Sequence, residues 1–306
     1  MNKHLLTYLK GMAMGAAEIV PGVSGGTIAL ITGIYEELIG SLSAFDLKSV
    51  QLLFKGQLAA LWERIHGTFL LTLFLGMLTS IFSLASAFAY ALEFFEIQLW
   101  SFFFGLVLAS AFLVIATLKV VKPHHALWVV AGAVIAYGLT SLPASAGADQ
   151  WYYIMASGAI AICAMILPGI SGSFILLLLG AYSIVLGAVN DLELAIILYF
   201  GIGAVLGLLT FTKLLKWVFA HYHDSTIALL SGFLLGSLNK LWPWKNVLET
   251  FTKHPGTEKE EIIPLVVEKV APDHLWPQAL AFALLGAAIV LGLHFAGRKK
   301  EAHNAA

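Results

Sequence analysis

The chain has 306 residues, of which 59% are hydrophobic and only 11% are charged, and its mean hydropathy is +0.88. A soluble domain carries about 25% charged residues, so this composition excludes an ordinary soluble protein. The formal net charge of −1 says little about partners, because in a membrane protein the position of each charge matters more than the sum. We expect no nucleic-acid partner, and the single cysteine, Cys163, excludes an intrachain disulfide.

Apolar segments follow one another along most of the chain. Several of them hold at least 19 residues without Asp, Glu, Lys or Arg. A helix needs about 20 residues to cross a bilayer, so we predict a polytopic membrane protein. The clearest of these segments are Gly67–Leu92, Ile97–Leu118, His125–Ala148 and Leu194–Thr212.

Two other apolar segments are interrupted by nearly the same motif. The first reads EIVPGVSGGTIALITGIYE from Glu18, and the second reads MILPGISGSFILLLLGAYS from Met165, 147 residues later. A weaker echo follows at a smaller offset, in which FGLVLAS from Phe104 resembles SGFLLGS from Ser231. We interpret the chain as two homologous halves, residues 1–148 and 149–300. The aligned positions are Pro21, Gly22, Ser24 and Gly25 with Pro168, Gly169, Ser171 and Gly172, and Gly33 and Tyr35 with Gly180 and Tyr182.

Each interrupted segment is too short for two full spans of about 20 residues. A hairpin with the break at its tip needs only a dozen or so residues in each arm to reach mid-bilayer, at about 1.5 Å per residue. We therefore predict re-entrant helical hairpins at about 8–40 and about 151–189. Three crossings per half is an odd number, so the second half is inserted upside-down. The predicted fold is all-α, with two inverted-topology repeats, each a re-entrant hairpin plus three transmembrane helices, as in many secondary transporters.

The charges support the hairpin interpretation. In this topology one side of the membrane receives twelve of the 17 Lys and Arg residues, and the other five lie in an external loop at about 240–277, where acidic residues match them. Basic residues gather on the cytoplasmic side, so both termini are predicted to be cytoplasmic. The twelve residues are Lys3, Lys10, Lys48, Lys55, Arg64, Lys119, Lys122, Lys213, Lys216, Arg298, Lys299 and Lys300.

The two breaks together predict an anion site. Pro ends each incoming arm and Gly permits a sharp turn, so the returning helix starts near Ser24 or Ser171 with free backbone N–H groups. Two such helix starts, entering from opposite faces, can point at one spot, and no Lys or Arg is expected at that depth. The alternative is that the motif only permits close helix packing. The predicted phosphate-binding residues are Gly22, Ser24, Gly25, Gly26 and Thr27 in the first break and Gly169, Ser171, Gly172 and Ser173 in the second.

Glu18 is the acidic residue nearest the first break. It precedes Pro21 by three residues, and the equivalent position in the second half is Met165. An ionised carboxylate at mid-bilayer costs about 2.5–3.5 kcal/mol, so we interpret Glu18 as a candidate proton carrier, with a structural, hydrogen-bonded Glu as the alternative. No pair of histidines has metal-ligand spacing inside the apolar segments, and neither a metal nor a cofactor is expected.

The stretch GMAMGAAEIVPGVSGGTIALITGIYEELI from Gly11 to Ile39 and its second copy LPGISGSFILLLLGAY resemble the bacterial polyprenyl-phosphate transporter family. The resemblance covers essentially the whole chain. It implies an undecaprenyl-phosphate translocase, a lipid flippase rather than an enzyme, in the bacterial inner membrane. Such a protein returns the carrier lipid of cell-envelope and peptidoglycan synthesis from the outer to the cytoplasmic leaflet. Its partners are the polyprenyl-phosphate lipid and the bilayer, and the oligomeric state stays open.

The charge of such a substrate makes proton coupling plausible on energetic grounds. A phosphomonoester carries about −1.5 to −2 charges at neutral pH. Moving it inward opposes an inside-negative potential at about 2.3 kcal/mol per charge per 100 mV. Our hypothesis is that protons carried by Glu18 offset this cost.

Two other function classes stay open at this point. Membrane undecaprenyl-pyrophosphate phosphatases also place Pro-Gly-x-Ser breaks in inverted hairpins, but their motif has an Arg after the Ser, where this chain has Gly25 and Gly172. Their companion pair of acids is also reduced here to Glu18 alone, and pyrophosphate cleavage without a cationic clamp is hard to support. A secondary transporter or channel for a small soluble anion is the other alternative, because the same helix starts would serve it.

Overall fold

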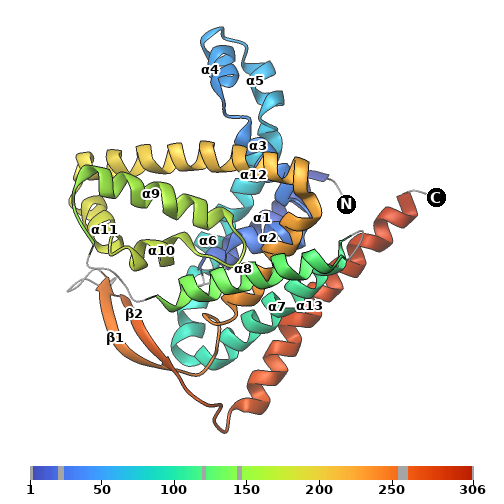
Figure 1. Ribbon diagram of the computed structural model, residues 1–306, viewed down its shortest axis with the longest axis vertical. Helices are drawn as coiled ribbons and strands as arrows, with labels where there is room; N and C mark the ends of the chain where they lie inside the picture. The colour runs from blue at the N-terminus through green and yellow to red at the C-terminus, as the bar shows by residue number, and fades with distance from the viewer. Residues whose placement is uncertain (1–2, 20–23, 119–121, 143–146, 254–260, 305–306) are drawn as a thin grey trace.

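The computed structural model describes residues 3–19, 24–118, 122–142, 147–253 and 261–304, and these residues are mostly helical (Figure 1). Broken segments open the first and second halves, and longer helices follow each of them. The elements of the first half are α1 Lys3–Ile19, α2 Gly25–Ile31, α3 Tyr35–Ser43, α4 Leu47–Phe54, α5 Leu58–Arg64, α6 Gly67–Phe94, α7 Glu96–Ala116 and α8 Pro123–Ser141. Those of the second half are α9 Trp151–Ile166, α10 Gly172–Leu178, α11 Tyr182–Asn190, α12 Leu194–Ser237, β1 Lys245–Lys253, β2 Glu261–Lys269 and α13 Trp276–Asn304.

Long apolar helices identify a helical, polytopic membrane protein. Within the described residues, α6, α7 and α12 are each long and apolar enough to cross a bilayer, and α10 with α11 forms a fourth candidate bent by 108°. The sequence predicted six full spans, so this count is lower than expected. One expected span corresponds to α8, which has 19 residues. Another corresponds to α13, of which residues 276–292 form a shorter apolar helix.

Helix α12 contains a break that divides it into two segments. Its 44 residues include Tyr222 with non-helical φ and ψ of −136° and 43°. At 1.5 Å per residue, 44 helical residues would extend about 66 Å, more than twice the hydrocarbon thickness of a bilayer. The part before Tyr222 packs on α9, and the part after it packs on α8.

Helix pairs in the two halves pack through glycines at matching positions. In the first half, a Cβ on Gly11 of α1 would lie 2.2 Å from the Leu73 carbonyl oxygen of α6. In the second half, a Cβ on Gly158 of α9 would lie 2.4 Å from the Phe200 carbonyl oxygen of α12. Gly158 follows Gly11 by 147 residues, and Phe200 follows Leu73 by 127. Both contacts depend on the missing side chain, since backbone atoms occupy the space that a Cβ would need.

A second pair of contacts crosses between the two halves. Gly286 of α13 faces the Phe102 carbonyl oxygen of α7, and Gly132 of α8 faces the Leu229 carbonyl oxygen of α12, with Cβ distances of 2.1 and 2.2 Å. Leu229 follows Phe102 by 127 residues, the same offset that separates Leu73 from Phe200. Each half therefore supplies one helix to each of two equivalent interfaces.

The all-α prediction is wrong for the 240–277 connection, which contains a two-stranded antiparallel sheet formed by β1 and β2. Both strands contain several β-branched residues, as in VLETFT and EIIPLVV, and these favour extended backbone. Charge and proline content masked this signal in the sequence. In Figure 1 the sheet lies at the lower left, whereas α4 and α5 project at the top. The start of α1 and the end of α13 lie on the same side of the molecule (Figure 1).

Candidate functional site

The first break begins after α1 and ends where α2 starts. Pro21 and the predicted site residue Gly22 lie outside the described residues. Ser24 is the N-cap of α2, with extended backbone, and its Oγ accepts a hydrogen bond of 3.1 Å from the Gly26 N–H. Ser is a preferred N-cap because its side chain satisfies one of the free N–H groups of the first turn. The prediction that the returning helix starts near Ser24 is confirmed.

The second break has the same position but different local chemistry. It runs from the end of α9 to Ser171, the N-cap of α10, whose side chain makes no capping hydrogen bond. The Ser171 Oγ instead lies 2.9 Å from the Ser173 Oγ. Gly169 has a φ of +82°, a conformation that favours glycine and lets the chain reverse between the two helices. The predicted start of the returning helix near Ser171 is confirmed as well.

The two breaks contact each other, although about half the chain separates them. The Gly169 N–H donates to Thr27 Oγ1 at 3.0 Å. Ser24 Oγ donates to the Met165 carbonyl oxygen at 3.2 Å, and the Tyr35 hydroxyl donates to the Ile166 carbonyl oxygen at 3.2 Å. Polar groups freed by one break are thus satisfied by the other, as buried backbone requires. We call this contact region the junction.

Gly26 brings the junction to its closest approach. A Cβ at this position would lie 2.5 Å from the Ile166 carbonyl oxygen, a backbone atom at the end of α9. Real Cβ atoms do not approach so closely, so any side chain at residue 26 would push the two breaks apart. Gly172 permits a close contact within the second broken segment rather than between the two breaks. A Cβ added there would lie 2.7 Å from the Ala161 carbonyl oxygen of α9.

Glu18 is in the last turn of α1, and its side chain reaches the start of α2. Its Oε1 accepts a hydrogen bond of 2.7 Å from the Gly25 N–H, so the predicted proton carrier and a predicted phosphate-binding residue are in direct contact. Among the described residues, no ion pair includes Glu18. The carboxylate therefore occupies the place that a bound anion would take at this N–H.

Most of the predicted phosphate donors are enclosed in the junction. Ser24 is 1% exposed, Thr27 is not exposed at all, and Ser171 is 8% exposed. Gly25, Gly26, Gly169 and Gly172 are buried too, whereas Ser173 is exposed. The structure thus brings the first and second predicted sets together, but most of their groups bind each other.

One neighbour of the second break was missed by the sequence analysis. The ammonium of Lys240 lies 4.2 Å from the ring centroid of Phe174, in the first turn of α10. The last turn of α12 packs against the second break, since a Cβ on Gly169 would lie 2.8 Å from Ser237 Oγ. Lys240 follows Ser237 by three residues and is therefore brought close to the break. The expectation that no Lys or Arg lies at the depth of the breaks did not foresee this contact of Lys240 with α10. The five lysines of the 240–277 connection had been counted as external because no pattern in the sequence shows this return.

A second missed feature is an additional turn in each returning arm. Gly33 separates α2 from α3 and Gly180 separates α10 from α11, with φ values of +71° and +64°. Each predicted arm is thus two short helices rather than one. The repeated Gly-x-Tyr pattern marked both turns, and in the first half it places Tyr35 directly on the junction.

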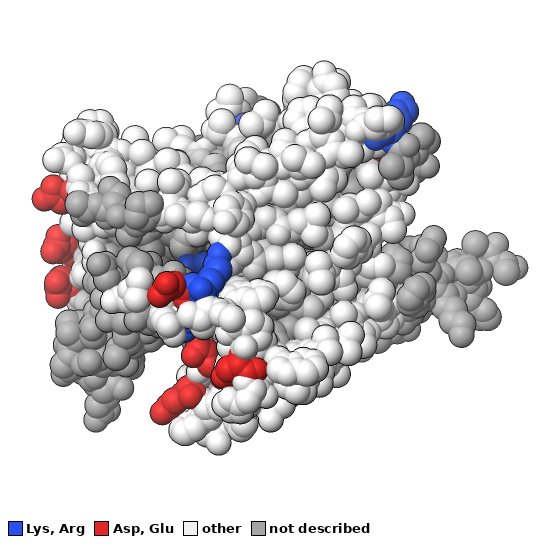
Figure 2. Space-filling model, turned by 60° about the horizontal axis from the view of Figure 1, so that its bottom comes forward, with Lys and Arg blue, Asp and Glu red and all other residues white. Residues whose placement is uncertain are grey.

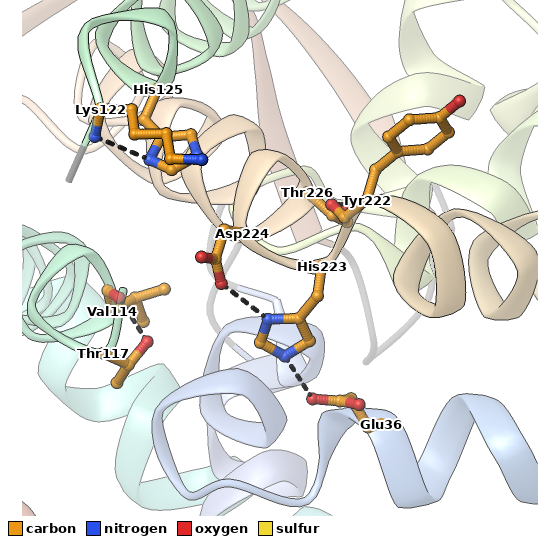
Figure 3. A network of polar contacts seen from close by, with 9 residues as sticks. All are labelled: Glu36, Val114, Thr117, Lys122, His125, Tyr222, His223, Asp224 and Thr226. Carbon is orange, nitrogen blue, oxygen red and sulfur yellow. Dashed lines mark hydrogen bonds and ion pairs between the residues drawn. The ribbon is translucent and has the colours of Figure 1, made fainter. Parts of the chain in front are cut away.

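A polar network braces the first broken segment against α12 (Figure 3). His223, just after the Tyr222 break, contacts Glu36 of α3 through Nε2 at 3.1 Å and Asp224 through Nδ1 at 3.1 Å. Glu36 is exposed but also connects the segment that carries the junction to the break in α12.

Comparison with known proteins agrees with these features. Residues 14–259 match the family model described as undecaprenyl phosphate translocase-like. The chain is 46% identical over 300 residues to a polyprenyl-phosphate transporter of Vibrio cholerae serotype O1, covering 95% of this chain and 96% of that protein. It is 34% identical over 258 residues to a polyprenyl-phosphate transporter of Staphylococcus aureus, covering 78% of this chain and 86% of that protein. No solved structure matches the chain. A match of this extent, on a helical membrane protein whose two Pro-Gly-x-Ser-Gly breaks meet, shows that the chain belongs to the undecaprenyl phosphate translocase-like family.

Proposed function

We propose that this protein moves undecaprenyl phosphate, or a related polyprenyl phosphate, across the bacterial cytoplasmic membrane, from the outer to the cytoplasmic leaflet. The family and the names of the two relatives support the substrate class. The observation that carries the mechanism is the contact between the two breaks, in which the Gly169 N–H donates to Thr27 Oγ1. A polar, irregular backbone junction amid apolar helices is tolerated only where protein or a polar cavity surrounds it.

The protein consists, in this proposal, of two inverted repeats at residues 1–148 and 149–300, each with a re-entrant hairpin. The glycine contacts at offsets of 147 and 127 residues support the repeat. The start of α1 and the end of α13 lie on one side of the molecule, which supports an even number of crossings. The twelve basic residues assigned to that side support cytoplasmic termini.

The phosphate group binds at the junction after the two breaks separate. In the arrangement seen here, the Gly25 N–H is bound to Glu18 and Thr27 is bound to Gly169. A phosphate oxygen that replaced the Glu18 carboxylate at Gly25 would gain a charge-assisted hydrogen bond. Separation of the breaks would free the hydroxyls of Ser24, Thr27 and Ser171, and Ser173 is already exposed. The apolar chain stays in the bilayer between the helices.

Proton coupling follows from competition for the Gly25 N–H. The ionised carboxylate of Glu18 and the substrate phosphate are both anions that bind this donor. Protonation removes the charge of Glu18 and weakens its hold on Gly25, because hydrogen bonds to charged groups are the stronger ones. Entry of the phosphate is thereby linked to uptake of a proton, which offsets part of the work against the membrane potential.

Reconstituted vesicles test the proposal. The purified protein is placed in liposomes that contain a fluorescent short-chain polyprenyl phosphate, and a membrane-impermeant phosphatase reports how much lipid stays accessible outside. We expect protein-dependent protection of the phosphate that is faster with an acidic exterior, and no phosphate release by the protein itself. Equal protection in protein-free liposomes would contradict the proposal, and phosphate release by the pure protein would favour the phosphatase alternative.

A further inference from the structure

Three lysine side chains meet beside the second break. Lys245 of β1 and Lys269 of β2 are directly paired in the antiparallel sheet. The Lys245 ammonium donates to the Lys240 carbonyl oxygen at 2.7 Å, which ties the start of the sheet to the turn that follows α12. We call Lys240, Lys245 and Lys269 the lysine cluster. Figure 2 shows the face that bears the sheet, where blue atoms lie in a recess with red atoms around it.

The cluster is supported by aromatic rings from three helices. Lys240 lies on Phe174 of α10 at 4.2 Å, Lys245 lies on Trp100 of α7 at 3.7 Å, and Lys269 lies 5.8 Å from Tyr137 of α8. These rings hold the ammonium groups by cation–π attraction without neutralising them. The helices belong to both halves of the chain, so the cluster lies where the halves meet.

Acidic residues lie near the cluster (Figure 2) but form no ion pair with it among the described side chains. In the part of the chain that the structure describes, none of the three ammonium groups forms an ion pair with a carboxylate within 4.0 Å. Glu96 of α7 is the acid that acts on Lys245, and its Oε1 already accepts a hydrogen bond from Trp100. Glu268 precedes Lys269 in β2 and is exposed. Like charges paired directly across two strands destabilise a sheet, so this arrangement favours a bound anion.

Burial makes the unmatched charge costly. Burial, together with the Lys240 charge, lowers the pKa of Lys245 to about 7. Burial and the Lys269 charge likewise lower the pKa of Lys240 to about 8. When no anion is present, Lys245 therefore loses its proton near neutral pH and Lys240 at a somewhat higher pH. A bound dianion would raise both pKa values and supply the negative partner that the ammonium groups lack.

We propose that the lysine cluster binds a phosphate dianion, at the entrance to the junction from the side of the sheet. This inference rests on the proposed function, in which the dianion is the head of a polyprenyl phosphate. Two or three lysines match a group of about −1.5 to −2 charges, and Lys binds phosphate as a point charge. The position of the lysine cluster fits the proposed path of the phosphate to the junction, since Lys240 contacts the first turn of α10, where the exposed Ser173 also lies. Free inorganic phosphate has the same chemistry, so the experiment separates the two sources.

Binding to the purified full-length protein in detergent tests the cluster. The probes are farnesyl phosphate, farnesol and inorganic phosphate, and calorimetry gives each dissociation constant at about pH 7 and about pH 9. The double variant Lys240→Gln with Lys245→Gln is compared with Lys48→Gln, a lysine exposed on α4. We expect the double variant to weaken farnesyl phosphate binding at least about tenfold. We expect Lys48→Gln to change nothing.

The probes identify the source of the dianion. Farnesyl phosphate binding much more tightly than inorganic phosphate supports the lipid head, whereas equal affinities that both fall in the double variant support the phosphate site with free phosphate as its ligand. Unchanged farnesyl phosphate affinity in the double variant overturns the proposal. If vesicles still translocate lipid in that case, the proposed function stands without the cluster. If wild type binds the lipid but never translocates it, the proposed function fails instead.

The pH dependence gives a second measurement that does not rely on the Gln variants folding. The groups that face Lys245 are Lys240, Lys269 and Glu96. As the pH rises from about 7 to about 9 the free lysines lose their protons, so wild-type affinity should fall. Arg stays charged at both pH values, so Lys245→Arg should keep its affinity at about pH 9. A Lys245→Arg variant that loses affinity as wild type does would overturn the assignment to Lys245.

Discussion

The two breaks share a motif, including the N-cap serines Ser24 and Ser171, but differ at three neighbouring positions that could do chemistry. Glu18 in the first corresponds to Met165 in the second, Gly26 corresponds to Ser173, and Thr27 corresponds to Phe174. The first break is closed: its carboxylate binds Gly25 and its hydroxyls bind the second break.

The second break is open on the other side. Ser173 is exposed, and the ring of Phe174 carries the Lys240 ammonium rather than donating a hydrogen bond across the junction. The two breaks therefore start their helices alike but have different side-chain surroundings. The first break holds the titratable group and the closing contacts, whereas the second has an exposed hydroxyl and a neighbouring ammonium group, where we propose that an anion binds. Each prediction below tests one side of this comparison.

The largest effect is expected from adding a side chain at Gly26, where the two breaks approach most closely. Gly26→Ala places a Cβ 2.5 Å from the Ile166 carbonyl oxygen, so the junction must separate. Overpacking of this kind costs about 1–3 kcal/mol, and we expect both a lower unfolding temperature and loss of vesicle transport. Gly40→Ala is the matched control, because nothing lies within 4 Å of a Cβ there. Equal behaviour of the two variants would show that the junction is not a closed contact.

The next effect concerns Glu18. Glu18→Gln keeps an oxygen that can accept from the Gly25 N–H but cannot change its charge. We expect transport to fall about tenfold, or about 1.4 kcal/mol in the barrier, and to lose its acceleration by an acidic exterior. Initial rates with and without a pH gradient measure both. A variant whose rate still responds to the gradient as wild type does would remove Glu18 from the coupling.

A smaller effect is expected at Thr27. Thr27→Val keeps the shape of a fully buried side chain but removes the acceptor of the Gly169 N–H. An unsatisfied buried donor costs about 1–3 kcal/mol, so we expect reduced thermal stability in detergent. Thr27→Ser retains the hydroxyl and serves as the control. If Val and Ser variants unfold at the same temperature, the contact between the breaks contributes nothing measurable.

How well the sequence predicted a feature depends mainly on how far apart in the chain the interacting residues lie. The starts of α2 and α10 were predicted correctly because Pro, Gly and an N-cap Ser act within a few residues of one another. The sheet at β1 and β2 was missed, since scattered charges hid two short extended segments. The second turn in each arm was missed although Gly33 and Gly180 marked it. The contact of Lys240 with Phe174 joins residues 66 positions apart, and no local pattern predicts it.

The sequence by itself determined that this is a helical membrane protein and predicted two related halves, because hydrophobic length and repeated helix-breaking residues are local properties that need no partner. It also identified Glu18 and the motif residues as the polar groups available inside apolar surroundings. Only the tertiary structure decided which of those groups satisfy each other and which stay free. Buried hydrogen-bond donors must find acceptors wherever packing brings them, so the pairing of Gly169 with Thr27, the contact of Glu18 with Gly25 and the return of Lys240 to α10 depend on the whole fold.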